Sequence, residues 1–261
     1  MASQTSTILR APATEADERN PFLIKLDRVV RLTPNDRQAL ANACRDVRSI
    51  PADRYIARTG DRPGYVHLIL EGWAVRCQLL SDGSRQITAF LLPGDLCDQH
   101  VTILGAMDHD IRTITPARVA HLPNGELEEL ARKSPQIARA LWWSTLVDEA
   151  VLRAWIANIG RREAYQRVGH ILCELHVRLE NIGLTNGAQF ELPVTQEELA
   201  DALGLTPVHV NRMLRRLREE GLIFTRRPWI TLRDIARLRE ACGFDGAYLD
   251  SHLAGANPFP V

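Results

Sequence analysis

The densest group of chemically capable side chains lies between Thr206 and Arg233, where seven arginines stand against two glutamates. The whole chain carries 32 basic and 32 acidic residues, so this excess of positive charge is local. A guanidinium group donates paired hydrogen bonds that fit phosphate oxygens and the edge of guanine. The segment therefore indicates contact with a nucleic acid, while an arginine-rich helix that is merely solvated is the alternative.

The residues that must position these arginines form the pattern of a helix-turn-helix in "VTQEELADALGLTPVHVNRMLRRLREEGLI". Thr195 and Glu198 make a capping box at the start of a first helix. Gly204 permits a sharp turn, and Thr206 followed by Pro207 begins a second helix. The inner positions of that second helix are Val210, Leu214 and Leu217. A hairpin signal, "IFTRRPWITL", follows and would form a wing, so the order of elements favours DNA binding.

The outward face of the second helix divides into base-reading and phosphate-binding positions. Arg212 suits a guanine edge, Asn211 suits an adenine edge, and Val208 suits the methyl group of thymine. Two roles are left open for His209: it contacts a phosphate, or it only covers the flank of the helix. The expected phosphate contacts are Thr195, Thr206, Arg215 and Arg216.

Length and composition fit a globular protein, with 261 residues of which 45% are hydrophobic and 25% charged. That length suits one large domain or two modest ones, and we favour two. Five cysteines are scattered without a CxxC pair, which argues against a zinc finger or a cysteine-ligated iron–sulfur cluster. Their odd number and the absence of a signal peptide predict the reducing cytoplasm, and no apolar run is long enough to span a membrane. No nucleophile elbow, P-loop or HExxH motif occurs, so we expect no enzyme.

The hydrophobic pattern divides the chain into successive segments. After a polar, aperiodic start and one short helical segment, short alternating strands with closely spaced turns appear, among them two strands joined at Asp82-Gly83. This pattern predicts an antiparallel roll or sandwich. A long helical run then begins at Ser134-Pro135. The expected segments are a disordered tail (1–20), the strand-rich domain (21–133), the long helix (134–160), the helix-turn-helix domain (161–249) and a second tail (250–261).

These segments, in this order, resemble the Crp/Fnr family of bacterial transcription regulators over nearly the whole chain after residue 20. The stretch "LILEGWAVRCQLLSDGSRQITAFLLPGDL", with its "PGD" turn, is similar to that family's effector domain. "LPVTQEELADALGL" and the terminal hairpin are similar to its DNA-binding domain. The resemblance implies an α+β fold with an N-terminal cyclic-nucleotide-binding-like β-roll (jelly roll), a long dimerisation helix and a C-terminal winged helix-turn-helix.

The resemblance also implies a cytoplasmic homodimer that regulates transcription at an inverted-repeat operator, with recognition helices about 34 Å apart. Double-stranded DNA, a second copy of the chain and RNA polymerase are the implied partners, and no membrane contact is expected. Trp142, Trp143 and Trp155 would either line an aromatic effector pocket or pack the long helix against the roll and across the dimer. The residues assigned to the dimer interface are Leu141, Val147, Val151 and Trp155.

Two departures from the family pattern affect the expected ligand and operator. Cyclic-nucleotide-binding members hold the phosphate with a Gly-Glu-Leu motif after "GD" and an Arg-Ser or Arg-Thr pair further on. Here Asp98-Gln99-His100 stands in the first place, and Arg112-Thr113 comes several residues late. Acidic side chains would repel a phosphate, so cyclic-nucleotide binding is not expected and the effector is unknown. Val208 stands where well-known members have a glutamate that binds cytosine.

A weaker group of candidate ligands lies in the strand-rich domain. Cys97 and His100, with His109 beyond, are residue types that bind a metal or a haem iron. We favour the interpretation that these residues only line an ordinary pocket at the ends of strands, so no metal is expected. The clustered N-terminal cysteines of oxygen-sensing members are absent, so no iron–sulfur cluster is expected either. Two alternative functions stay open: a cytoplasmic sensor or scaffold whose helix-turn-helix binds protein, and a cyclic-nucleotide-responsive activator.

Overall fold

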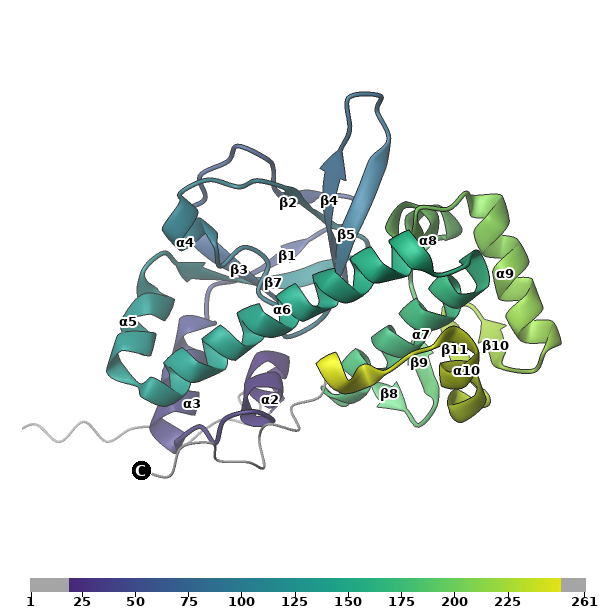
Figure 1. The fold of residues 1–261 in the computed structure, drawn as a ribbon. Helices are drawn as coiled ribbons and strands as arrows, with labels where there is room; N and C mark the ends of the chain where they lie inside the picture. Colours follow the sequence, from purple (N-terminus) through teal and green to yellow (C-terminus); the bar gives the residue numbers. More distant parts are fainter. Residues whose placement is uncertain (1–18, 250–261) are drawn as a thin grey trace, which may run out of the picture.

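The computed structural model describes residues 19–249, which form a strand-rich roll, one long helix and a helix-rich C-terminal domain (Figure 1). The tails predicted at residues 1–20 and 250–261 lie outside the described residues, except for residues 19 and 20. Asn20 caps helix α2 (Pro21–Asp27), because its side-chain oxygen accepts a hydrogen bond from the Phe22 amide at 3.0 Å. Within the described part of the chain, no helix is long and apolar enough to cross a membrane.

The roll consists of two antiparallel sheets, as the alternating strands predict. One sheet has the strand order β1-β7-β3 and the other β2-β6-β4-β5. Asp82-Gly83 lies in the turn between β4 and β5, and the pairing sets Val75 opposite Phe90, both of which are buried. The strands are β1 (Val47–Ile50), β2 (Tyr55–Ala57), β3 (Tyr65–Glu71), β4 (Ala74–Leu79), β5 (Arg85–Leu91), β6 (Asp110–Thr113) and β7 (Ala117–Pro123).

Three short helices pack against one end of the roll, and a fourth lies between β5 and β6. The three helices share one apolar cluster with β3, β7 and the start of the long helix. The "PGD" turn lies tightly against α2, since a Cβ at Gly94 would stand 2.8 Å from the carbonyl oxygen of Pro21. Only glycine fits there without displacing the backbone. Besides α2, these helices are α3 (Pro34–Ala43), α5 (Glu126–Lys133) and α4 (Val101–Leu104).

The long helix, α6 (Pro135–Arg161), runs along the roll and reaches the C-terminal domain (Figure 1). Ser134 caps it by accepting a hydrogen bond from the Ile137 amide, and its 27 residues span about 40 Å. Its inner face is buried along its length, and near its end Trp155 packs on Phe90 with ring centroids 5.7 Å apart. The helix therefore belongs to the cores of both domains.

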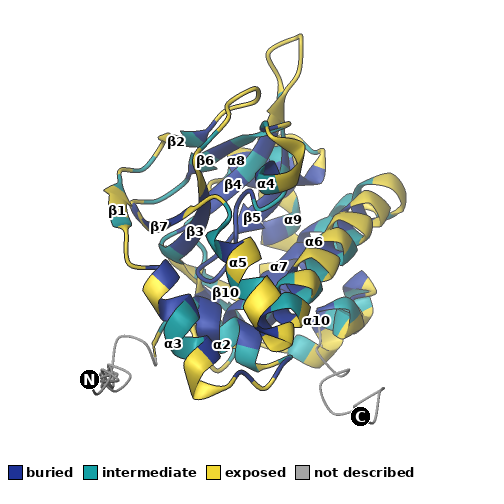
Figure 2. Ribbon diagram, turned by 90° about the vertical axis from the view of Figure 1, so that its left-hand side faces the viewer, coloured by how far each residue is buried: buried dark blue, intermediate teal, exposed yellow. Residues whose placement is uncertain are grey.

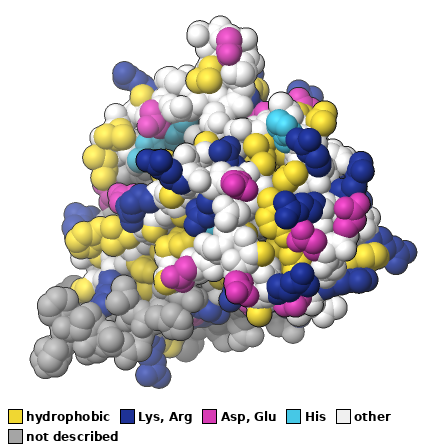
Figure 3. All heavy atoms as spheres, turned by 45° about the vertical axis from the view of Figure 1, so that its right-hand side comes forward, with side chains coloured by type: hydrophobic (Ala, Val, Ile, Leu, Met, Phe, Trp, Pro, Cys, Tyr) yellow, Lys and Arg dark blue, Asp and Glu magenta, His cyan; other side chains and the backbone are white. Residues whose placement is uncertain are grey.

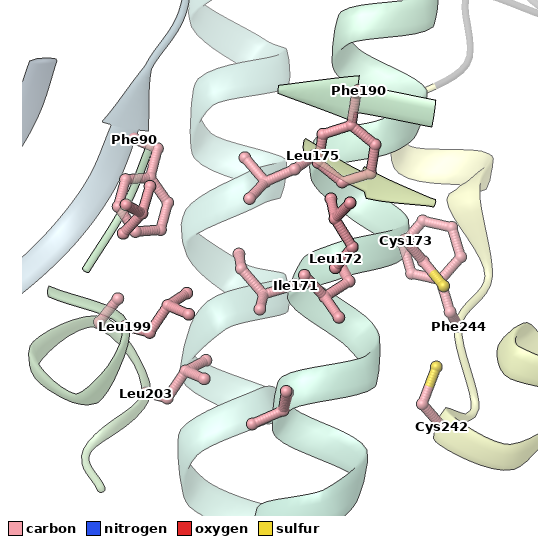
Figure 4. Packing of buried hydrophobic residues seen from close by; sticks show 14 of the residues in the cluster. Phe90, Ile171, Leu172, Cys173, Leu175, Phe190, Leu199, Leu203, Cys242 and Phe244 are labelled. Carbon is pink, nitrogen blue, oxygen red and sulfur yellow. The ribbon is translucent and has the colours of Figure 1, made fainter. Parts of the chain in front are cut away.

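Helix α7 (Ala164–Glu180) is the centre of the C-terminal domain. Its Ile171, Leu172 and Leu175 meet apolar side chains from elements on both sides, including Phe190 and Leu199 (Figure 4). A four-stranded sheet of order β10-β11-β9-β8 completes the domain. The remaining elements are β8 (Thr185–Asn186), β9 (Gln189–Glu191), α8 (Gln196–Leu203), α9 (Pro207–Glu219), β10 (Ile223–Arg226), β11 (Trp229–Leu232), α10 (Ile235–Cys242) and a 3-10 turn (Gly246–Tyr248).

A buried polar network joins the roll, α6 and the C-terminal domain. Asp95 of the "PGD" turn accepts hydrogen bonds from Lys25 Nζ and Arg178 Nη2, each at 2.7 Å. Burial alone would raise the pKa of Asp95, but the two cations outweigh it and lower that pKa to about 2. On α7, Glu174 accepts a hydrogen bond from Trp155 Nε1 at 3.0 Å and pairs with Arg178 at 3.5 Å. Burial raises the pKa of Glu174, so the charges that tie the three parts of the chain together are those of Asp95, Lys25 and Arg178.

Candidate nucleic-acid interface

The predicted helix-turn-helix is formed by α8 and α9, and both predicted caps are present as hydrogen bonds. Thr195 Oγ1 accepts from the Glu198 amide at 3.1 Å, and Glu198 Oε2 accepts from the Thr195 amide at 2.8 Å. Thr206 Oγ1 accepts from the His209 amide at 3.3 Å. Between the helices, Gly204 has a left-handed φ of 61°, which a side chain would strain. The caps, worth about 1 kcal/mol each, fix where each helix begins.

Helix α9 buries one face and exposes the other. Val210, Leu214 and Leu217 are buried in the core that α7 and α8 share. Val208 is 74% exposed at the start of α9, and both Arg212 and Arg215 are exposed further along. In residues 19–249, no group forms a hydrogen bond or ion pair with the guanidinium of Arg212 or of Arg215. Two charged groups on a rigid helix are therefore free to bind an anion.

Other predicted contact residues are already engaged within the chain. Asn211 Nδ2 donates a hydrogen bond to Gln196 Oε1 at 3.1 Å, so the Asn211 amide can pair with adenine only after it leaves Gln196. The hydroxyl groups of Thr195 and Thr206 accept the capping bonds. His209 is exposed next to Val208 on the outer side of α9.

Arg216 lies on the side of α9 that faces α7. Its Nε donates to Glu220 Oε1 at 2.8 Å, and its guanidinium carbon stands 4.3 Å from the centre of the Tyr165 ring. The Tyr165 hydroxyl donates to the same Glu220 carboxylate. Arg216 thus holds α9 against α7, and it is a weaker candidate for a phosphate contact than Arg215.

The wing predicted from the sequence is the β10–β11 hairpin, which places the exposed Arg226 and Arg227 beside α9. Figure 3 brings this side of the molecule forward and shows many Lys and Arg side chains, with acidic side chains among them.

Sequence reasoning missed one contact that positions α8. Arg85 of β5 pairs with Asp201 of α8 at 2.6 Å, and the two residues are 116 positions apart. No local pattern could have linked them.

A double-sheet roll, a long helix and an exposed helix-turn-helix with a wing define a DNA-binding transcription regulator with a regulatory domain. Family models support both parts: residues 47–134 match the cyclic nucleotide-binding domain, and residues 166–241 match the Crp-like helix-turn-helix domain. The chain belongs to the Crp/Fnr family of transcription regulators.

Individual relatives agree with this assignment. The transcriptional activator protein FnrL of Cereibacter sphaeroides is 30% identical over 202 residues, which are 76% of this chain and 81% of FnrL. The nitrogen fixation regulation protein FixK of Azorhizobium caulinodans is 30% identical over 177 residues, or 67% of this chain and 70% of FixK. The solved structure of FixK2 from Bradyrhizobium japonicum matches with a TM-score of 0.67 at 30% identity, over 74% of this chain and 95% of that one. The predicted family, fold class and function in DNA-binding transcription regulation are confirmed.

The structure corrects two of the four residues that were assigned to a dimer interface on α6, while Leu141 and Val147 stay a prediction. Val151 is buried and Trp155 is only 4% exposed, because both pack against the roll and α7 of their own chain. Leu141 and Val147 are half-buried against the same chain. Periodicity showed that α6 is apolar, but the helix has two apolar stripes and the chain's own core takes one of them. The other, here called the outer stripe, consists of Trp142, Leu146, Leu152 and Ile156, all exposed.

The surroundings of Asp98 also differ from expectation. This residue of the roll stands where cyclic-nucleotide-binding members of the family have a glycine–glutamate pair. Asp98 is fully buried and accepts a hydrogen bond from the His67 amide at 2.7 Å, and it also pairs with the His67 ring. Its carboxylate therefore does not face an open pocket, and the expected repulsion of a phosphate by Asp98 is wrong. Arg112 of β6 pairs with Asp53 at the edge of the roll.

Proposed function

We propose that the protein acts as a homodimer on an inverted-repeat operator, with α9 of each copy in the major groove. The observation that carries the proposal is the outer face of α9, where Arg212 and Arg215 lack partners within residues 19–249. The buried inner face and the cap at Thr206 hold these groups on a rigid helix. Such a helix beside a basic wing suits the major groove of duplex DNA.

The outer stripe of α6 supports the homodimer. Trp142 is 71% exposed and Ile156 72% exposed, and the outer side of α6 is largely exposed in Figure 2. These two residues are two heptads apart, so they share one face of the helix. Exposed large apolar side chains in a row are costly in water, and an antiparallel or parallel copy of the same helix would cover them.

We assign different parts of the DNA to different side chains of α9. Arg212 reads a guanine edge, and Val208 packs on a thymine methyl group near the start of the helix. Arg215 and the wing residue Arg226 bind phosphates. FnrL is named a transcriptional activator, which supports activation as the mode of regulation and RNA polymerase as a further partner.

The proposal is tested by sedimentation equilibrium together with selection of bound sequences from a random DNA pool. The chain should sediment as a dimer and select inverted repeats with half-sites about one helical turn apart. Ile156→Glu places a charge in the outer stripe and should give a monomer with much weaker operator binding. Gln136→Glu adds the same charge at an exposed position elsewhere on α6 and should change neither.

Two outcomes would contradict the proposal. One is a wild-type chain that sediments as a monomer at concentrations where it binds DNA. The other is a set of selected sequences without two-fold symmetry. If the two variants lose dimerisation equally, the outer stripe is not the interface.

A further inference from the structure

Three side chains with metal-binding atoms meet beside α4, in the roll. His100 directly precedes α4, and Asp108 and His109 lie in the loop before β6. One nitrogen of each imidazole and one carboxylate oxygen of Asp108 lie within 4.8 Å of one another. The two imidazole rings are neighbours, with centroids 5.1 Å apart. The fold thus brings together three donors that the chain supplies from two segments.

Each imidazole has a buried nitrogen without a partner. His100 Nε2 and His109 Nε2 are both buried, and neither forms a hydrogen bond with any group in residues 19–249. His100 Nε2 stands 3.4 Å from Asp108 Oδ1 without hydrogen-bond geometry, whereas His109 Nδ1 lies 2.6 Å from the same oxygen. A buried nitrogen that stays unsatisfied costs about 1–3 kcal/mol. A bound cation would satisfy both nitrogens.

We propose that His100, Asp108 and His109 bind one divalent transition-metal ion, such as Zn²⁺, Fe²⁺ or Co²⁺. Two imidazole nitrogens and one carboxylate oxygen are a donor set that suits these ions and leaves positions for water or another ligand. Ca²⁺ and Mg²⁺ prefer sets made of oxygen alone, so they fit poorly. His109 Nδ1 lies 2.6 Å from Asp108 Oδ1, so the Asp108 carboxylate must leave this hydrogen bond to bind an ion that His109 holds through Nε2.

The distances are compatible with an ion after a small adjustment. Metal–ligand bonds of about 2.1 Å place tetrahedral donors about 3.4 Å apart. The three donor atoms lie within 4.8 Å of one another, so they must approach by up to about 1.4 Å. Asp108 is exposed in a loop and has room to make that movement. Cys97, the other ligand considered from the sequence, is buried in an apolar cluster and is not one of the three. The expectation of no metal is thereby revised.

The proposed site adjoins the long helix. Gln99, the neighbour of His100, donates a hydrogen bond to Thr145 of α6, and His100 and Trp142 line the same groove. Arg76 of β4 pairs with Asp148 of α6 at 2.9 Å. The buried positive charge of Arg76 therefore has its own acidic partner, and the Asp108 carboxylate is not needed to balance it. An ion that orders α4 would therefore act on α6 next to the outer stripe. This consequence rests on the proposed homodimer, whereas the metal site does not.

Metal titration of the full chain tests the site directly. The protein is purified without a histidine tag, treated with EDTA and titrated with Co²⁺, whose visible spectrum reports its coordination, and then with Zn²⁺ as competitor. We expect one ion per chain. His100→Ala, His109→Ala and Asp108→Asn should each weaken binding by more than about 10-fold. His209→Ala removes an exposed histidine of α9 and should bind as the wild type does.

Circular dichroism of each variant shows whether the fold is kept, and Asp108→Asn, on an exposed side chain, provides a test that does not alter the core. The proposal is overturned if the wild type takes up neither ion, or if the three site variants bind as tightly as His209→Ala. Because the readout is metal binding without DNA, these results are independent of whether the protein dimerises on an operator.

Discussion

Arg215 and Arg216 are adjacent in α9, and the structure gives them different roles in DNA binding. The exposed Arg215 guanidinium has no partner in residues 19–249, whereas Arg216 pairs with Glu220 at 2.8 Å and lies over Tyr165. We therefore expect Arg215→Ala to weaken binding to DNA of every sequence and Arg216→Ala to weaken it much less.

The magnitude follows from the number of phosphates lost. In a homodimer, Arg215→Ala removes one contact from each half-site, and each contact contributes about 0.9 to the slope of log K against log salt. The slope should fall by about 1.8, which at 0.1 M salt corresponds to about 60-fold in affinity, or about 2.4 kcal/mol. Arg216→Ala should change the slope by less than about half as much, because its guanidinium must leave Glu220 before it meets a phosphate.

Fluorescence anisotropy of labelled duplexes across a salt series measures both the slope and the affinity. An operator duplex and an unrelated duplex are compared, since phosphate contacts affect both and base contacts affect only the first. Arg212→Ala is the matched comparison and should lose about 1–3 kcal/mol of discrimination at a single base pair. Equal slopes for Arg215→Ala and Arg216→Ala would refute the division of roles. A wild-type slope for Arg215→Ala would refute the phosphate contact itself.

Three further predictions concern the free energy of unfolding of the full chain, measured with denaturant. Burial lowers the pKa of His170 from 6.5 to about 4, so the folded state should lose about 3 kcal/mol as the pH falls from 6.5 to 4, and His170→Phe should flatten this dependence. Asp95→Asn should cost about 2 kcal/mol at neutral pH, and the difference from wild type should vanish as the pH falls from 4 toward 2. Glu191→Gln, at an exposed position of β9, should show neither effect. Gly204→Ala should destabilise by about 1–2 kcal/mol because its backbone is left-handed, whereas Gly160→Ala, inside α6 with open space around it, should stabilise by about 0.5–1 kcal/mol.

Each of these stability predictions has a contrary result. A His170→Phe curve parallel to that of wild type between pH 6.5 and 4 would show that His170 is not the buried neutral group. An Asp95→Asn difference that persists at low pH would mean that lost packing, and not lost charge pairing, causes the destabilisation. Equal effects at Gly204 and Gly160 would remove backbone conformation as the cause.

The sequence predicted the helix-turn-helix nearly residue by residue, because its signals are local. Thr195, Gly204 and Thr206 act through backbone geometry and through bonds to residues no more than three positions away. The turn at Asp82-Gly83 is equally local. Where the physical interaction spans only a few residues, the spacing of residue types is enough to specify it.

The choices between distant partners were not predictable in the same way. Periodicity identified α6 as apolar, yet it could not tell whether Trp155 or Trp142 would face the chain's own core. Asp98 was expected to repel a phosphate from the pocket that relatives use, but it is paired with His67, which lies 31 positions away on a strand. The meeting of His100 with His109 depends on how the loop after α4 folds back. In each case the deciding contact is long-range, and one sequence carries no pattern for it.

The buried network around Asp95 determines where a signal can change the position of the recognition helices. Separating Arg178 from Asp95 would leave Asp95 with Lys25 and Arg178 with Glu174, so each would lose one of two charged partners in a buried site. The C-terminal domain is therefore tied to the roll of its own chain by buried ion pairs. In the proposed dimer, the spacing of the two α9 helices then depends on how the outer stripes pack, because the protomers can rotate at that interface.

A small difference in free energy is enough to change how the two protomers are rotated at this interface. A difference of about 1.4 kcal/mol between two packings of the outer stripe changes their ratio tenfold. Trp142 lies in the stripe and lines the same groove as His100, so an ion at the proposed metal site would act at the interface itself. The long helix would then convert a local change beside α4 into a change in the distance between recognition helices.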